Sequence, residues 1–186
     1  IKDPNVFPLK PEANKFSLTV LHRNSNSMKK YSKDLMDYFR KILEGLKFND
    51  RISLMDFNSA AELLLAPSGK KLTILDSLEK IKFEKDPADG LDYALYQAIS
   101  KNMNNEFYNA VLLIDDGSHK SEFKKYNPEV LATYAQKNGV PIFVFVMDDG
   151  AATEQLKYIA EESGGMYLNF YKSNTYSICI IASCIL

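Results

Sequence analysis

The chain has 186 residues, of which 46% are hydrophobic and 25% charged, an ordinary composition for one globular domain with a single core. Its formal net charge is −1, so the protein as a whole has no electrostatic attraction to nucleic acid or to an anionic membrane surface. The sequence also contains no apolar stretch of transmembrane length. We therefore predict no nucleic-acid partner and no membrane insertion by this segment.

The first 14 residues, IKDPNVFPLKPEAN, are rich in proline and are predicted to be a linker or N-terminal extension. The domain is expected to span residues 15–186, where strand and helix patterns alternate. We predict strands over residues 16–22, 51–57, 60–65, 108–114, 141–147 and 166–170. We predict helices over residues 28–46, 75–81, 91–101, 128–138, 152–163 and 176–186.

Two features of these patterns indicate how the sheet is built. Residues 108–114 and 141–147 are almost wholly apolar, which is typical of parallel strands covered on both faces. Only Asn58 and Ser59 separate two of the predicted strands, so that pair is expected to be antiparallel. The sequence therefore predicts a three-layer α/β fold with a doubly wound, mostly parallel sheet and one antiparallel edge strand.

Polar side chains follow the first predicted strand directly, in the loop RNSNSM at residues 23–28. Ligands of open α/β sheets bind at the carboxyl ends of the strands. Ser25 and Ser27 would point two hydroxyl oxygens into one crevice, as a hard cation requires, or they would cap the helix that follows. Arg23 stands two residues before Ser25, where a cation site would need a carboxylate.

Further segments complete a recognisable series: NDRISLMDF at 49–57, LDYAL at 91–95, VLLIDDGSH at 111–119, GVPIFVFVM at 139–147 and LKYIAEESGGMYLNF at 156–170. Together with RNSNSM, which is similar to a D-x-S-x-S-M loop, they resemble the von Willebrand factor A (vWA) domain family. The resemblance covers about residues 15–186. It implies a Rossmann-like, doubly wound sheet with a metal-ion-dependent adhesion site (MIDAS) at its upper rim.

The resemblance also implies a set of site residues. In the family, a magnesium-type ion is held by an aspartate and two serines of the first loop, a threonine of the second and an aspartate of the third. Ser25 and Ser27 match the serines, and Asp116 matches the third-loop aspartate. Arg23 replaces the first aspartate, and Asp89 falls where the threonine would be. We expect all five residues to form a partner-binding rim, in which Ser25, Ser27, Asp89 and Asp116 would ligate Mg²⁺ or another divalent cation.

Arg23 weakens any such metal site. At ~5 Å, its repulsion of a neighbouring positive charge is roughly 3 kcal/mol at an effective dielectric constant of 20, or about two orders of magnitude in affinity. Either Arg23 turns to solvent and the oxygens keep a cation, or its guanidinium lies between Asp116 and Asp89 as a built-in cation. We favour the second arrangement, a degenerate site with weak or absent metal binding.

No catalytic motif is visible, because the sequence lacks a G-x-S-x-G elbow, a G-x-x-x-x-G-K-[ST] phosphate loop and a G-x-G-x-x-G fingerprint. We therefore predict a non-catalytic adhesion or interaction module that binds another protein through the rim. We expect no firmly bound cofactor, and the one candidate is Mg²⁺ or another divalent cation. The alternative is a structural scaffold domain of a larger multidomain protein, with no rim ligand.

Five other residues receive ordinary interpretations. Asp115 is interpreted as a turn residue, His22 and His119 as polar rim residues, and Cys179 and Cys184 as buried small hydrophobes. The cellular compartment is not determined by the sequence. A Lys- and Asn-rich composition without Trp is typical of an AT-rich genome. Many domains of the resembled type in such organisms are exported, which favours an exported or cell-surface protein.

Overall fold

The computed structural model describes residues 15–83, 90–103, 106–117, 123–148 and 153–170. Its strands are β1 (Phe16–Arg23), β2 (Arg51–Phe57), β3 (Ala61–Ser68), β4 (Tyr108–Asp115), β5 (Ile142–Val146) and β6 (Tyr167–Asn169). Its helices are the 3₁₀ helix η1 (Asn26–Tyr31) and the α-helices α1 (Ser32–Gly45), α2 (Lys71–Glu79), α3 (Leu91–Lys101), α4 (Pro128–Lys137) and α5 (Thr153–Ser163). The proposed linker at 1–14, the helix predicted at 176–186 and both cysteines lie outside the described residues.

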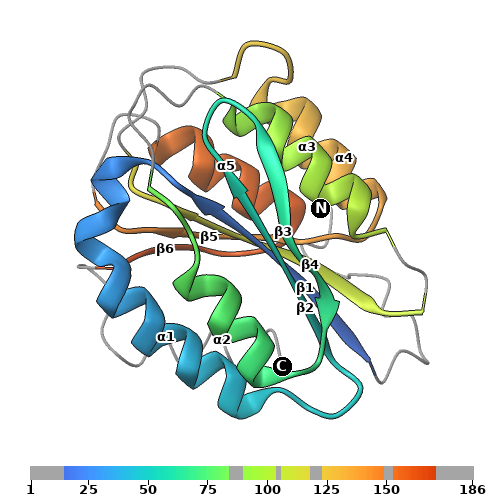
Figure 1. Ribbon diagram of the computed structural model, residues 1–186. Coiled ribbons are helices and arrows are strands. Elements are labelled where there is room, and N and C mark those ends of the chain that lie inside the picture. The colour runs from blue at the N-terminus through green and yellow to red at the C-terminus, as the bar shows by residue number, and fades with distance from the viewer. Residues whose placement is uncertain (1–14, 84–89, 104–105, 118–122, 149–152, 171–186) are drawn as a thin grey trace.

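The six strands form one sheet in the order β3-β2-β1-β4-β5-β6. Neighbouring strands are parallel throughout, except that β2 and β3 pair antiparallel at the edge. Helices α1 and α2 cover one face of the sheet, and α3, α4 and α5 cover the other (Figure 1). The predicted three-layer, mostly parallel α/β fold with one antiparallel edge strand is therefore confirmed.

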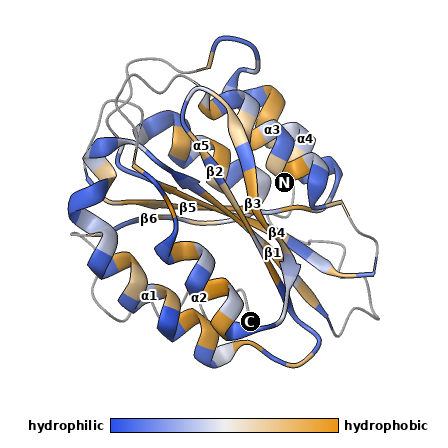
Figure 2. Cartoon of the chain, viewed as in Figure 1, coloured by the Kyte–Doolittle hydropathy of each residue, from blue (hydrophilic) through white to orange (hydrophobic). Residues whose placement is uncertain are grey.

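Successive side chains of the central strands enter two separate cores. On β1, Leu18 and Val20 pack in the core under α1 and α2, whereas Leu21 packs in the core on the opposite face. Strand β5 is buried at every position, and the central strands are mostly hydrophobic in Figure 2. Covered faces on both sides explain why β5 is apolar at every position. No helix in the described part of the chain is long and apolar enough to cross a lipid bilayer.

Two helices differ from their predicted bounds by more than one residue. The helix predicted from residue 28 starts as η1 and becomes α-helical only at Ser32. Helix α2 spans Lys71–Glu79 rather than residues 75–81, because the backbone N–H of Ile74 already bonds to the carbonyl of Lys70. Where a helix starts and ends depends on backbone hydrogen bonds more than on apolar spacing.

Strand β3 is longer than the sequence predicts. The pattern ends at Leu65, but the strand continues to Ser68, which pairs with Ile52 of β2 beyond an irregularity in the register. Pro67 lies within this extension and is tolerated because β3 is at the edge of the sheet, where a missing N–H donor removes no ladder bond to a further strand.

Candidate functional site

The carboxyl ends of β1 and β4 meet at one edge of the sheet. In the register of β1 with β4, His22 lies opposite Ile114, so Arg23 at the end of β1 lies beside Asp115 at the end of β4. On the other side of β1, Arg23 is paired with Phe57, the last residue of β2. The central position of β1 therefore brings the loop after Arg23 next to the turn after Asp115.

Arg23 points into this edge and not into solvent. Its side chain is 2% exposed, and its Nε donates a hydrogen bond of 3.0 Å to Oδ2 of Asp115. The same Nε lies 4.0 Å from Oδ1 of Asp116, and Cζ lies 5.2 Å from the centre of the Phe57 ring. A buried guanidinium needs such partners, because an uncompensated buried charge is strongly destabilising.

Asp115 has a larger role than the turn that the sequence suggested. Its side chain is fully buried, with one oxygen bonded to Arg23 and the other accepting the backbone N–H of Gly117 at 2.6 Å. Gly117 has a φ of 74°, a conformation that favours glycine. Asp115 thus fixes both the guanidinium and the tight turn. One sequence signal could have identified Asp115: two predicted parallel strands, β1 and β4, each end next to a charged residue, Arg23 and Asp115, of opposite sign.

The two serines and Asp116 form a hydrogen-bonded cluster beside this ion pair. The Ser27 hydroxyl donates to Oδ2 of Asp116, and the hydroxyls of Ser25 and Ser27 are 2.7 Å apart. The Ser25 hydroxyl also lies 3.5 Å from the same Asp116 oxygen. Ser25 stands at the N-cap position of η1, but its side chain makes no capping hydrogen bond. The serine oxygens therefore face Asp116 and each other instead of capping the helix.

The end of β2 adds polar groups that the sequence analysis missed. Asn24 donates from Nδ2 to Oδ2 of Asp56 at 3.0 Å, and its backbone N–H bonds to the carbonyl of Phe57. Both Asn24 and Asp56 are buried, and they line a cavity of about 310 Å³ next to the rim. Only the pairing of β1 with β2 places Asp56 here, since 32 positions separate it from Asn24.

Asp89 lies outside the described residues, but the glycine that follows it is placed. The N–H of Gly90 bonds to the carbonyl of Asn58 at 3.1 Å, and a Cβ added to Gly90 would lie 2.7 Å from the carbonyl oxygen of Ser59. Such a distance is too short for a real side chain. The chain therefore enters α3 in close backbone contact with the turn between β2 and β3.

The described residues fit a magnesium-type ion poorly. Mg²⁺ requires near-octahedral ligation by oxygen. Here the Asp116 carboxylate is 4.0 Å from a guanidinium nitrogen, and the serine hydroxyls are engaged with that carboxylate. No three His, Cys, Asp or Glu side chains within the described ranges gather as a metal site. Positive charge next to Asp116 comes from Arg23.

His22 is buried, which corrects its interpretation as a polar rim residue. Its ring is 2% exposed and meets the Phe83 ring edge to face, with centroids 6.1 Å apart. Burial lowers the pKa of His22 from 6.5 to about 4, and the nearby Asp115 charge only partly opposes this shift. The imidazole is therefore neutral at pH 7. His119 lies outside the described residues.

No protein-family model matches the chain, and no curated protein matches its sequence. Solved structures do match it. BatB, a conserved hypothetical protein from Bacteroides thetaiotaomicron, superposes with a TM-score of 0.73 at 15% identity, covering 90% of this chain and 96% of BatB. Proximal thread matrix protein 1 (PTMP1) from the mussel byssus gives 0.72 at 16% identity, covering 93% of this chain and 45% of PTMP1.

The VWA domain of SpRpn10 also superposes, with a TM-score of 0.68 at 12% identity, covering 88% of this chain and 93% of that domain. At such identities the similarity establishes the fold alone. The resemblance seen in the sequence motifs is confirmed at that level. The order of six strands, the single antiparallel edge and the helices on both faces are those of a vWA-like domain.

Proposed function

We propose that this protein is a non-catalytic interaction module that docks another protein through the rim at the carboxyl ends of β1 and β4. The rim comprises Arg23, Ser25, Ser27 and Asp116, together with Asp89 as a member expected from the sequence. Two proteins of similar fold support this class by analogy: a thread matrix protein of the mussel byssus and the VWA domain of SpRpn10.

The observation that carries the proposal is the buried contact between Arg23 and Asp115, at 3.0 Å. One structure of PTMP1 has zinc in its MIDAS motif. In this chain a guanidinium lies at the carboxyl ends of β1 and β4 and provides a fixed positive charge beside Asp116. We infer that the rim keeps its shape without a metal ion, and that partner binding does not depend on one.

The more exposed residues that a partner would touch lie among and next to the rim residues in the sequence. Asn26 and Lys29 are exposed, and Ser27 is half-buried. Lys30 is also exposed and lies 3.6 Å from Asp148. Arg23, Ser25 and Asp116 are buried and would hold the loop in one conformation. This arrangement suits a partner surface with carboxylates and hydrogen-bond acceptors, because exposed lysines attract them.

An enzymatic role has less support. Nucleophilic catalysis by serine requires an activating base within hydrogen-bond reach. Within the described residues, the hydroxyls of Ser25 and Ser27 bond to Asp116 and to each other, and His22 makes no hydrogen bond to either serine. The remaining alternative is a scaffold domain that is assembled through other faces.

A capture experiment separates these alternatives. The domain would be immobilised and exposed to an extract of its source organism, with Asn26→Trp as the rim variant and Lys137→Trp as the control. Lys137 is exposed at the end of α4, close to where β5 starts and therefore far from the rim. We expect one specific protein to bind the parent and the control, equally in Mg²⁺ and in EDTA, and to be lost from Asn26→Trp. Binding retained by Asn26→Trp would favour the scaffold role, and loss in EDTA would contradict a metal-independent rim.

Metal binding is tested directly by calorimetric titration of Mg²⁺, Mn²⁺ and Ca²⁺ into the parent domain and into Arg23→Asp. We expect little or no heat from the parent and measurable binding by the variant, since the substitution removes a positive charge and adds a carboxylate. Tight binding of a metal ion by the parent would contradict the proposal that Arg23 takes the place of the cation.

A further inference from the structure

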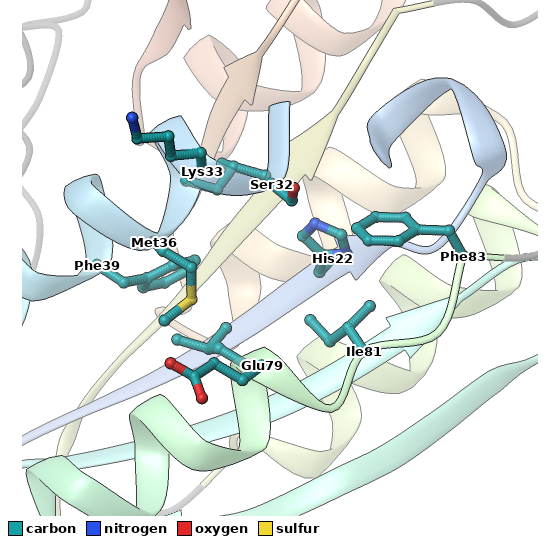
Figure 3. Close-up of a pocket in the computed structure, with 10 residues that line it drawn as sticks. His22, Ser32, Lys33, Met36, Phe39, Glu79, Ile81 and Phe83 are labelled. Carbon is teal, nitrogen blue, oxygen red and sulfur yellow. The ribbon is translucent and has the colours of Figure 1, made fainter. Parts of the chain in front are cut away.

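A cavity of about 320 Å³ lies beside the rim, between the first half of α1, the end of α2 and the segment that follows α2. Figure 3 shows side chains from these three elements around one space. Most of its wall is apolar: Leu35, Met36, Phe39, Leu78, Ile81 and Phe83. The volume is at the lower end of the range for small-molecule sites, which run from roughly 300 to 1,000 Å³.

His22 contributes a polar side chain to the wall of this cavity. Its side chain is 2% exposed, and its Nδ1 is buried without a hydrogen-bond partner in the described structure. Figure 3 shows the imidazole between Ser32 and Phe83, at the wall of the cavity. A buried nitrogen of this kind is unfavourable unless something bonds to it, and native proteins contain few of them. The cavity provides the space for a bonding group.

We propose that this cavity, the His22 pocket, binds a small uncharged phenol with a single ring, whose hydroxyl bonds to Nδ1 of His22. The apolar walls suit the ring. A hydroxyl group suits the nitrogen, because it can donate to Nδ1 when that atom is unprotonated and accept from it in the other neutral tautomer. Lys33 and Glu79, which have opposite charges, also line the pocket but are exposed, so neither sign of charge is favoured inside.

The test uses p-cresol and toluene as probes, which differ only in the hydroxyl. Each would be titrated into the ¹⁵N-labelled domain while amide resonances are followed by NMR. We expect p-cresol to shift resonances around the pocket and to bind about 3- to 10-fold more tightly than toluene, the gain typical of one net hydrogen bond. Equal affinity for the two probes, or shifts confined to another part of the molecule, would overturn the proposal.

Variants localise the binding. Met36 is half-buried in the wall, so Met36→Trp fills the pocket from its edge and should abolish the p-cresol shifts. Met103→Trp, at an exposed methionine after α3, is the matched control and should bind like the parent. His22→Phe should keep toluene binding and lose the preference for p-cresol. Undiminished p-cresol binding by a folded Met36→Trp would refute the site.

Discussion

The clearest quantitative consequence of the structure concerns acid stability and His22. Burial holds the pKa of His22 at about 4 in the folded protein, compared with 6.5 for an exposed histidine. Between these two values the unfolded chain binds a proton that the folded chain does not. Above pH 6.5 the burial of neutral His22 does not lower the free energy of unfolding. As the pH falls, protonation of the unfolded chain lowers that free energy progressively, and the effect reaches its full size below about pH 4.

The size of the effect follows from the separation of the two pKa values, about 2.5 pH units. Each unit corresponds to about 1.4 kcal/mol, so acidification from pH 7 to pH 4 should cost about 3 kcal/mol through this one residue. That is a large part of the 5–15 kcal/mol typical of a folded domain. The Asp115 carboxylate partly opposes the shift, and the exposed charged residues Lys33 and Glu79 line the same pocket as the ring.

The assay is urea unfolding followed by far-UV circular dichroism at pH 7, 6, 5 and 4, for the parent, His22→Phe and His22→Gln. Carboxylates also titrate in this range, but they do so in all three proteins, so the difference in unfolding free energy isolates His22. We expect both variants to gain about 3 kcal/mol relative to the parent between pH 7 and pH 4. If the free energy of unfolding changed by the same amount in all three proteins between pH 7 and pH 4, His22 would not be a buried, neutral histidine.

Three further predictions concern contacts around the rim, all measured by urea unfolding at pH 7. Arg23→Met should destabilise the fold by about 3–5 kcal/mol, because it leaves the Asp115 carboxylate buried without its positively charged partner. Adding Asp115→Asn should restore part of the loss, and a double variant less stable than Arg23→Met would contradict the pairing. Gly90→Ala should cost about 1–3 kcal/mol through overpacking against backbone carbonyls, and an unchanged midpoint would show that the turn yields easily. Asp92→Ala should cost about 2–3 kcal/mol, since the buried Asp92 carboxylate accepts the N–H groups of Lys125 and Tyr126 at 2.6 and 3.0 Å. The exposed Glu161→Ala is the control for this last change and should alter stability by no more than about 0.5 kcal/mol.

Much of the fold could be predicted from local patterns. Strand β2 and helix α3 were predicted with the bounds that the structure has, because each begins after a clear turn and has a consistent apolar face. The almost wholly apolar segments identified β4 and β5 as strands covered on both faces. The two-residue connection identified the antiparallel edge pair.

The candidate site depended far more on the tertiary structure. The sequence indicated Arg23 and Asp116 but assigned no partner to Asp115, which is the residue that Arg23 bonds. It also placed His22 at the polar rim, although the side chain is buried under Phe83. Charge, apolar spacing and turn residues are properties of short segments, and the sequence by itself determined what depends on them. Arg23 and Asp115 are 92 positions apart, and only the register of β1 against β4 decides which carboxylate a guanidinium meets.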